Sequence, residues 1–142
     1  MADGPQPAGS GPVGLEAFDA FTPWVRWWLR AEGVAAFLGG IALWLILDQP
    51  LPLFVVLLFV PDVSMLGYLM GPHAGAIAYN VAHNWATAGA LLLLGFLAEA
   101  GVLILAGTVL LAHVGIDRAL GYGLKYPTGF ADTHLGRIGR RR

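Results

Sequence analysis

Four long apolar stretches, joined by very short connections, constrain this chain more than any other feature. The stretches run from about Trp24 to Leu47, Leu51 to Met70, Gly75 to Leu97 and Gly101 to Tyr122. A helix crosses a bilayer core about 30 Å thick with about 20 apolar residues, and each stretch reaches that length. Apolar residues make up 57% of the 142 residues and charged residues 12%, against about 25% charged residues in soluble domains. The sequence therefore predicts an all-α fold, a bundle of four transmembrane helices.

The basic residues predict how this bundle is oriented. The connections Asp48–Pro50, Gly71–His73 and Glu99–Ala100 are short, so successive helices should be antiparallel neighbours. In that arrangement all eight basic residues fall on one side of the membrane: Arg26, Arg30, Arg118, Lys125, Arg137, Arg140, Arg141 and Arg142. Basic residues are retained on the cytoplasmic side. We therefore expect a multi-pass protein of the bacterial cytoplasmic (inner) membrane, with both termini cytoplasmic.

Composition divides the chain into four segments. We expect a disordered tail over residues 1–14, an interfacial segment on the membrane surface over 15–22, a four-span membrane domain over 23–123 and a cytoplasmic basic tail over 124–142. Pro and Gly in the first segment leave too little apolar surface for a folded core. Thr22 is suited to cap the first transmembrane helix and Pro23 to begin it. The basic tail should fold back beneath the membrane domain.

Five ionisable residues interrupt the apolar stretches, namely Glu32, Asp62, His83, His113 and Asp117. The first four lie seven to nine residues from the cytoplasmic end of their stretches, about 12 Å deep at 1.5 Å per residue. Asp117 lies one turn closer to the cytoplasm on the same helix face as His113. Ionisable groups at such depth are costly and indicate a functional site. Together with Arg118, they predict a polar layer on the cytoplasmic half of the bundle.

Three interpretations of this polar layer remain open. The first is a hydrogen-bonded network that fixes the register of the helices. The second is a divalent metal site formed by Asp62, His83, His113 and Asp117, since carboxylate and imidazole ligands suit zinc and harder transition metals. The third is a tetrapyrrole with His83 or His113 as its axial ligand. The chain has no cysteine, which excludes thiolate ligands and disulfide bonds.

Three segments are familiar in combination. They are PDVSMLGY at Pro61–Tyr68, GAIAYNVAH at Gly75–His83, and HVGIDRALGYGLKY at His113–Tyr126, which continues to THLG at Thr133–Gly136. They resemble a family of small bacterial membrane proteins catalogued as domain of unknown function 4260. The resemblance covers about Trp28 to Gly136. It supports the membrane prediction and implies no activity.

For function, two hypotheses follow from these features. The small size and short loops favour a non-catalytic accessory or structural subunit of a larger membrane complex, such as a photosynthetic or electron-transfer assembly. The alternative is a membrane-embedded, metal-dependent hydrolase-like enzyme that uses the Asp/His layer. We expect the partners to be the lipid bilayer and other membrane protein subunits, and we expect no nucleic acid.

Overall fold

The structure is a computed structural model that describes residues 13–139, with side chains from Trp24 onward. Its helices are α1 (Val13–Ile46), α2 (Leu51–Leu57), the 3₁₀ helix η1 (Pro61–Met70), α3 (Pro72–Ala82), α4 (Trp85–Leu97) and α5 (Gly101–Leu120). Two short strands, β1 (Asp132–Thr133) and β2 (Gly136–Arg137), pair antiparallel near the C-terminus. Most of the expected tail over residues 1–14, and the final Arg140–Arg142, lie outside the described residues.

The expected membrane fold is confirmed in outline. Three helical segments, Trp24–Ile46, Leu51–Met70 and Gly101–Leu120, are long and apolar enough to cross a membrane, and α4 is a shorter apolar helix. Large apolar side chains along these segments are widely exposed; Leu69 and Val102, for example, keep 85% and 80% of their surface accessible. A soluble protein rarely exposes so much apolar surface. These faces are therefore surfaces that contact lipid.

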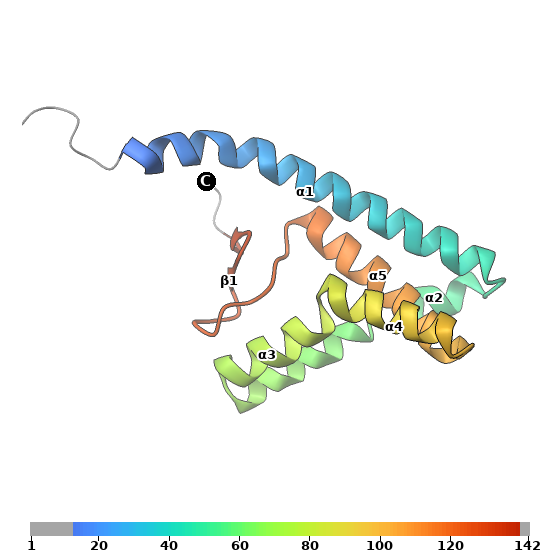
Figure 1. Cartoon of the computed structure of the whole chain (residues 1–142). Coiled ribbons are helices and arrows are strands. Elements are labelled where there is room, and N and C mark those ends of the chain that lie inside the picture. The colour runs from blue at the N-terminus through green and yellow to red at the C-terminus, as the bar shows by residue number, and fades with distance from the viewer. Residues whose placement is uncertain (1–12, 140–142) are drawn as a thin grey trace, which may run out of the picture.

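Helix α5 is the central helix of the structure, packed against α1 and α4 (Figure 1). The α1 and α5 backbones touch at Gly33 and Gly115, where a Cβ on Gly115 would lie 2.6 Å from the Phe37 nitrogen. The α4 and α5 backbones approach similarly at Gly95 and Gly107. Small residues allow such close contact between membrane helices, where the hydrophobic effect does not favour association.

Helix α1 begins earlier than the sequence predicted. It runs without interruption from Val13 to Ile46, so the expected interfacial segment at 15–22 is part of the same helix and Thr22 does not begin it. Leu15, Phe18 and Phe21 repeat at helical spacing, which agrees with a helix before Pro23. A position of the segment on the membrane surface stays a prediction.

The second and third apolar stretches are each interrupted. Residues 58–60 separate α2 from η1, and His83 and Asn84 separate α3 from α4. The third stretch is therefore not the single helix expected over Gly75 to Leu97. Asn84 causes this break, because its Oδ1 accepts the Thr87 N–H at the start of α4 while its Nδ2 donates to carbonyls in the last turn of α3. This is a side-chain cap at a helix N-terminus.

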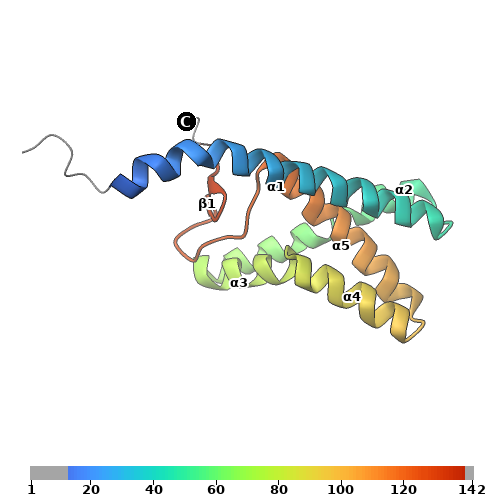
Figure 2. The same cartoon turned by 45° about the horizontal axis from the view of Figure 1, so that its top comes forward.

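Beyond the two breaks, η1 and α3 pack against each other and diverge from α1 and α5 (Figures 1 and 2). The Tyr68 ring covers Gly75 in this pair, leaving no room for a Cβ there. The C-terminal segment, residues 124–139, lies between the divergent pair and α1 in both views. The Asn80 side chain on α3 holds it, since Nδ2 donates to Lys125 O at 2.9 Å and Oδ1 accepts from Lys125 N at 2.7 Å. The described part of the expected tail thus folds back against α3.

The glycine contact between α1 and α5 gives a first prediction. Gly115→Ala places a Cβ against the α1 backbone, so we expect a loss of about 1–3 kcal/mol in the free energy of unfolding. Gly39→Ala is the matched control, because a Cβ at Gly39 meets nothing within 4 Å. It should be neutral, or stabilising by up to about 1 kcal/mol through helix propensity. Unfolding in mild detergent measures both, and equal stability of the two variants would contradict the packing described.

Candidate metal centre

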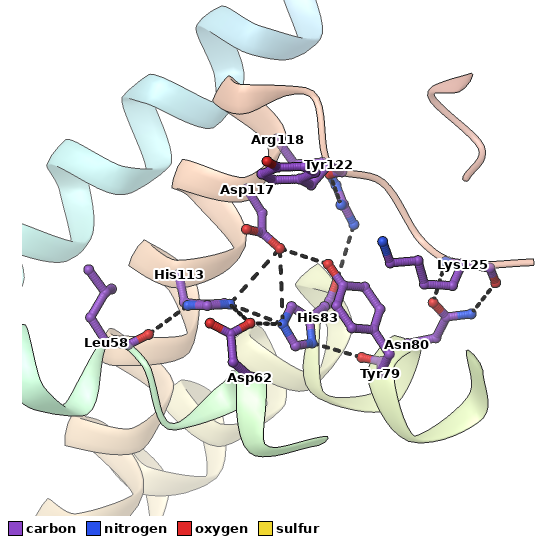
Figure 3. Close-up of polar contacts among 10 residues, drawn as sticks. All are labelled: Leu58, Asp62, Tyr79, Asn80, His83, His113, Asp117, Arg118, Tyr122 and Lys125. Atoms are coloured by element: carbon purple, nitrogen blue, oxygen red, sulfur yellow. Dashed lines mark hydrogen bonds and ion pairs between the residues drawn. The ribbon is translucent and has the colours of Figure 1, made fainter. Parts of the chain in front are cut away.

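Two helix breaks and one helix face bring four ionisable side chains together. Asp62 lies in the first turn of η1, directly after Pro61, and His83 directly follows α3. His113 and Asp117 lie one turn apart on α5. Figure 3 shows the four side chains converging from these three elements. We refer to Asp62, His83, His113 and Asp117 as the Asp/His cluster.

A backbone carbonyl orients each imidazole of the cluster. His83 Nδ1 lies 2.9 Å from Tyr79 O, and His113 Nδ1 lies 2.6 Å from Leu58 O. Since a carbonyl oxygen only accepts hydrogen bonds, both Nδ1 atoms must carry a hydrogen. In a neutral imidazole the other nitrogen, Nε2, then has a free lone pair. Both Nε2 atoms are therefore available as metal ligands.

The breaks in the helices supply these carbonyls. In the 3₁₀ pattern each N–H bonds to the carbonyl three residues earlier, so the donor for Leu58 O would come from residue 61. That residue is Pro61, which has no N–H, and His113 Nδ1 donates in its place. Helix α3 ends at Ala82, and the carbonyl of Tyr79 in its last turn bonds to the His83 ring.

The two Nε2 atoms face each other at 3.0 Å. Two lone pairs at that distance repel, so either a cation lies between them or one ring carries a second proton. Asp62 Oδ1 lies 3.4 Å from His83 Nε2 and 3.5 Å from His113 Nε2. A single N–H points to one acceptor, whereas one metal ion binds all three atoms at once. The three atoms could therefore hold one metal ion, and without one the 3.0 Å separation is that of an N–H···N hydrogen bond in a singly protonated pair.

Two of the three separations, from Asp62 Oδ1 to each Nε2 atom, match those of a tetrahedral metal site, whereas the 3.0 Å between the Nε2 atoms is shorter. Zinc binds imidazole nitrogen and carboxylate oxygen at about 2.0–2.2 Å, which places ligand atoms about 3.3–3.6 Å from one another. Asp117 Oδ2 is farther away, 4.0 Å from His83 Nε2 and 3.9 Å from His113 Nε2. Asp62, His83 and His113 could therefore provide three ligands, and the Asp117 carboxylate lies just outside this set.

Tyr79 positions both Asp117 and His83. Its hydroxyl donates a hydrogen bond to Asp117 Oδ2 at 2.8 Å. Its ring stacks on the His83 imidazole, with centroids 3.7 Å apart and planes 11° apart. Tyr79 is almost fully buried, so its side chain has little freedom to leave these two contacts. The carboxylate of Asp117 is thereby held at the edge of the ligand set.

Arg118 supports the site from the opposite side. It is buried, and its guanidinium donates to His83 O at 3.0 Å and to Tyr122 O at 2.6 Å. The first contact fixes the backbone at the break between α3 and α4. Arg118 therefore links the α5 terminus to the position of a ligand.

Lys125 closes the site from the C-terminal segment. It is buried, and its ammonium group lies 4.9 Å from the Tyr79 ring centroid and 4.1 Å from that of Phe130. Burial, which disfavours the charged form, lowers the pKa of Lys125, although nearby Asp117 opposes the shift. The aromatic faces partly replace the solvation of the ammonium group.

The structure brings together five of the six residues predicted for the polar layer: Asp62, His83, His113, Asp117 and Arg118. Glu32 is different. It lies on an exposed face of α1, beside Gly33, which packs on α5. The position of Glu32 along its span predicts its depth in the membrane but not the direction in which its side chain points, which is away from the cluster.

Sequence reasoning missed the positioning role of Tyr79 and the burial of Lys125. Tyr79 precedes His83 by four residues and so shares its face of α3; that spacing was the available signal. For Lys125 no local signal exists, because its burial depends on how the C-terminal segment folds back. The cluster also argues against a tetrapyrrole, since the Asp62 carboxylate occupies the space directly beside both Nε2 atoms.

The fold is that of a small membrane protein, and its Asp62, His83 and His113 lie close enough together that they could hold a metal ion. The chain belongs to the family described as domain of unknown function 4260, which matches residues 26–138. That range includes the whole Asp/His cluster, and it confirms the family resemblance. No curated protein and no solved structure significantly matches the chain.

His134 fastens the C-terminal segment that closes the site. Its Nδ1 accepts the Leu124 N–H at 2.8 Å, and the backbone N–H of His134 donates to Leu124 O at 3.1 Å. Only a ring nitrogen without a hydrogen accepts such a bond. Partial burial, and then the nearby charge of Arg118, lower the pKa of His134.

The protonation of His134 gives a second prediction. Because its pKa is lower in the folded state, the unfolded state binds more protons, and this contact should weaken as pH falls below about 6.5. Hydrogen exchange at the Leu124 amide, corrected for its intrinsic rate, should accelerate in that range. The acceleration should disappear in His134→Gln and persist in His73→Gln. An unchanged pH dependence in His134→Gln would contradict this account.

Proposed function

We propose that this protein is a membrane-embedded, metal-dependent hydrolase whose ion is bound by Asp62, His83 and His113. The observation that carries the proposal is the 3.0 Å approach of two Nε2 atoms whose Nδ1 hydrogens are both engaged by carbonyls. Metal-binding histidines characteristically donate their second N–H to such an acceptor. Zinc is the first choice of ion, and manganese and iron accept the same ligand types.

Asp117 favours catalysis over a purely structural ion. Structural zinc sites have four protein ligands, whereas catalytic sites have three and leave one position for water. Asp117 lies too far from the other ligand atoms to complete a compact set, and Tyr79 holds it there. A metal ion lowers the pKa of its bound water to about 7. Asp117 would be placed to accept a proton from that water, and the bound ion would supply the water activation that hydrolysis of a carbonyl or phosphoryl ester requires.

An apolar cavity suggests the class of substrate. It has a volume of about 480 Å³ and lies where α2, α4 and α5 meet the two helix breaks. Its walls include Pro61 and Ala82, the chain neighbours of Asp62 and His83. A polar substrate gains little from such walls, whereas an acyl or isoprenoid chain buries apolar surface there. We therefore propose a lipid-soluble substrate.

The proposal includes the orientation of the protein in the bacterial cytoplasmic membrane. The basic residues gather at the end of the structure that carries Arg26, Arg30 and Arg118, and the loops containing Asp48 and Glu99 contain none. This asymmetry supports cytoplasmic termini. The metal centre would then lie in the cytoplasmic half of the bilayer.

The ligand set gives the third prediction. Purified protein should bind about one equivalent of zinc, and His83→Ala or His113→Ala should weaken binding by at least about 100-fold, more than the loss of an outer-shell partner. Asp117→Asn should still bind zinc but lose hydrolysis of fluorogenic lipid esters or phosphodiesters. Elemental analysis and titration with a metal indicator measure binding.

His73→Ala is the matched control, since His73 is exposed at the start of α3 and should leave zinc binding unchanged. A folded protein that binds none of zinc, manganese or iron would overturn the metal site. If Asp117→Asn also loses the metal, Asp117 is a fourth ligand. The site would then be structural, and the hydrolase proposal would fail while the metal site stood.

A second candidate function is a non-catalytic accessory subunit of a membrane complex, and Glu32 favours it. Within residues 24–139 Glu32 forms no ion pair, and it is exposed within a candidate membrane span. An ionisable group that faces lipid is costly unless a partner neutralises it. Gly39 lies seven residues along on the same helix face and is open to close approach. These two residues suit a transmembrane helix of another protein that carries a hydrogen-bond donor.

Crosslinking gives the fourth prediction. A photoreactive residue in place of Glu32 or Gly39 should trap an unrelated membrane polypeptide in native membranes. The same residue in place of Val34, which is exposed on the other flank of α1, should trap only lipid. If all three positions crosslink to lipid alone or to a second copy of this chain, the subunit hypothesis fails.

A further inference from the structure

Four arginines surround a cavity that the metal centre does not use. The cavity has a volume of about 430 Å³ and lies between the first turns of the α1 span, the end of α5 and the C-terminal segment. Arg26 and Arg30 come from α1, Arg118 from α5 and Arg137 from β2. We refer to this space as the arginine cavity. Its volume falls in the range of small-molecule sites, about 300–1,000 Å³.

The charges around the arginine cavity are poorly compensated. No acidic residue is among those lining it. Within the part of the chain that has described side chains, Arg137 is the one lining arginine with a carboxylate within 4.0 Å, at 3.7 Å from Asp132. Arg118 is only 6% exposed, and its hydrogen bonds go to neutral carbonyls. Among the described side chains, Arg26, Arg30 and Arg118 therefore have no paired carboxylate, and Arg118 is buried.

The end of α5 offsets only part of this charge. Arg30 lies beside Gly121 at the helix C-terminus, and Arg118 donates to the carbonyl of Tyr122. A helix C-terminus is equivalent to about half a negative charge. Helix capping therefore offsets only part of the charge of the four arginines, and the described part of the cavity is suited to a bound anion.

Trp24, Trp27 and Trp28 indicate the depth of the arginine cavity. These three side chains are each more than half exposed and lie on the same turns of α1 as Arg26 and Arg30. Exposed tryptophans concentrate at the headgroup level of a membrane. The arginine cavity is thus placed at the level of lipid phosphates.

We infer that the arginine cavity binds a phosphate group, carried by either a phospholipid headgroup or a soluble phosphate compound. Planar guanidinium groups match phosphate oxygens with paired N–H donors. The remaining volume accommodates the group to which the phosphate is attached. This inference is independent of the proposed hydrolase activity, since none of the metal ligands lines the cavity.

Binding to the full-length protein in a neutral detergent tests the inference. Inorganic phosphate and dihexanoyl phosphatidylglycerol are titrated separately by calorimetry. The test variant is Arg26→Gln/Arg30→Gln. The control is Arg140→Gln/Arg141→Gln, which removes the same charge from the C-terminal end of the sequence. We expect the test variant to weaken binding at least 10-fold and the control to weaken it less than 3-fold.

The result of this titration either distinguishes a phospholipid headgroup from a soluble phosphate compound or shows that the arginine cavity binds neither. If both inorganic phosphate and the lipid bind, and only the test variant weakens their binding, the result supports a site for soluble phosphate compounds. If only the lipid binds, the result supports a site for a lipid headgroup. No binding to the wild-type protein, or equal loss in the two variants, overturns the inference. If Arg26→Gln/Arg30→Gln does not fold, as judged by thermal unfolding, Arg137→Gln replaces it under the same criteria.

Discussion

The bonds from two imidazole N–H groups to the carbonyls of Leu58 and Tyr79 are the interactions on which the rest of the site depends. An unbroken membrane helix has no carbonyl to offer, because each one accepts from the residue four positions along. The breaks at residues 58–60 and 83–84 release these acceptors. Each histidine in turn satisfies a carbonyl that lipid could not. The breaks in the helices and the orientation of His83 and His113 therefore depend on each other.

Helix α5 makes this arrangement possible by holding both breaks at one level. It carries His113 and Asp117 on the face that meets the breaks, and glycines on the faces that meet α1 and α4. Close packing at Gly115 leaves α5 little freedom to rotate, and a small rotation would separate His113 from Leu58. The glycines therefore position a ligand, although they contribute no polar group.

Much of the fold followed from composition, while the site followed only in part. Four apolar stretches and their short connections predicted the helices, since lipid makes span length a strict requirement. The break at Asn84 was not predicted, because hydropathy does not register a capping amide within an apolar run. Depth counted along the spans selected Asp62, His83 and His113, which the structure brings together, and helical spacing from His113 added Asp117. Depth also selected Glu32, which is exposed on α1. Depth fixes the level of a residue but not its face, and the rotation of α1 depends on its glycine contact with α5.

Arg118 shows why the two candidate sites should be considered together. Its guanidinium donates to the carbonyl of His83 and also lines the arginine cavity. An anion in that cavity would attract the same group that holds the His83 backbone at the break. The two sites can then influence each other through one side chain, with no change elsewhere in the bundle. A ligand shifts such an equilibrium only as far as it binds the two positions of Arg118 differently. Because Arg118 is buried and already has two acceptors, its movement is restricted, and the coupling should be small compared with the binding of either ligand.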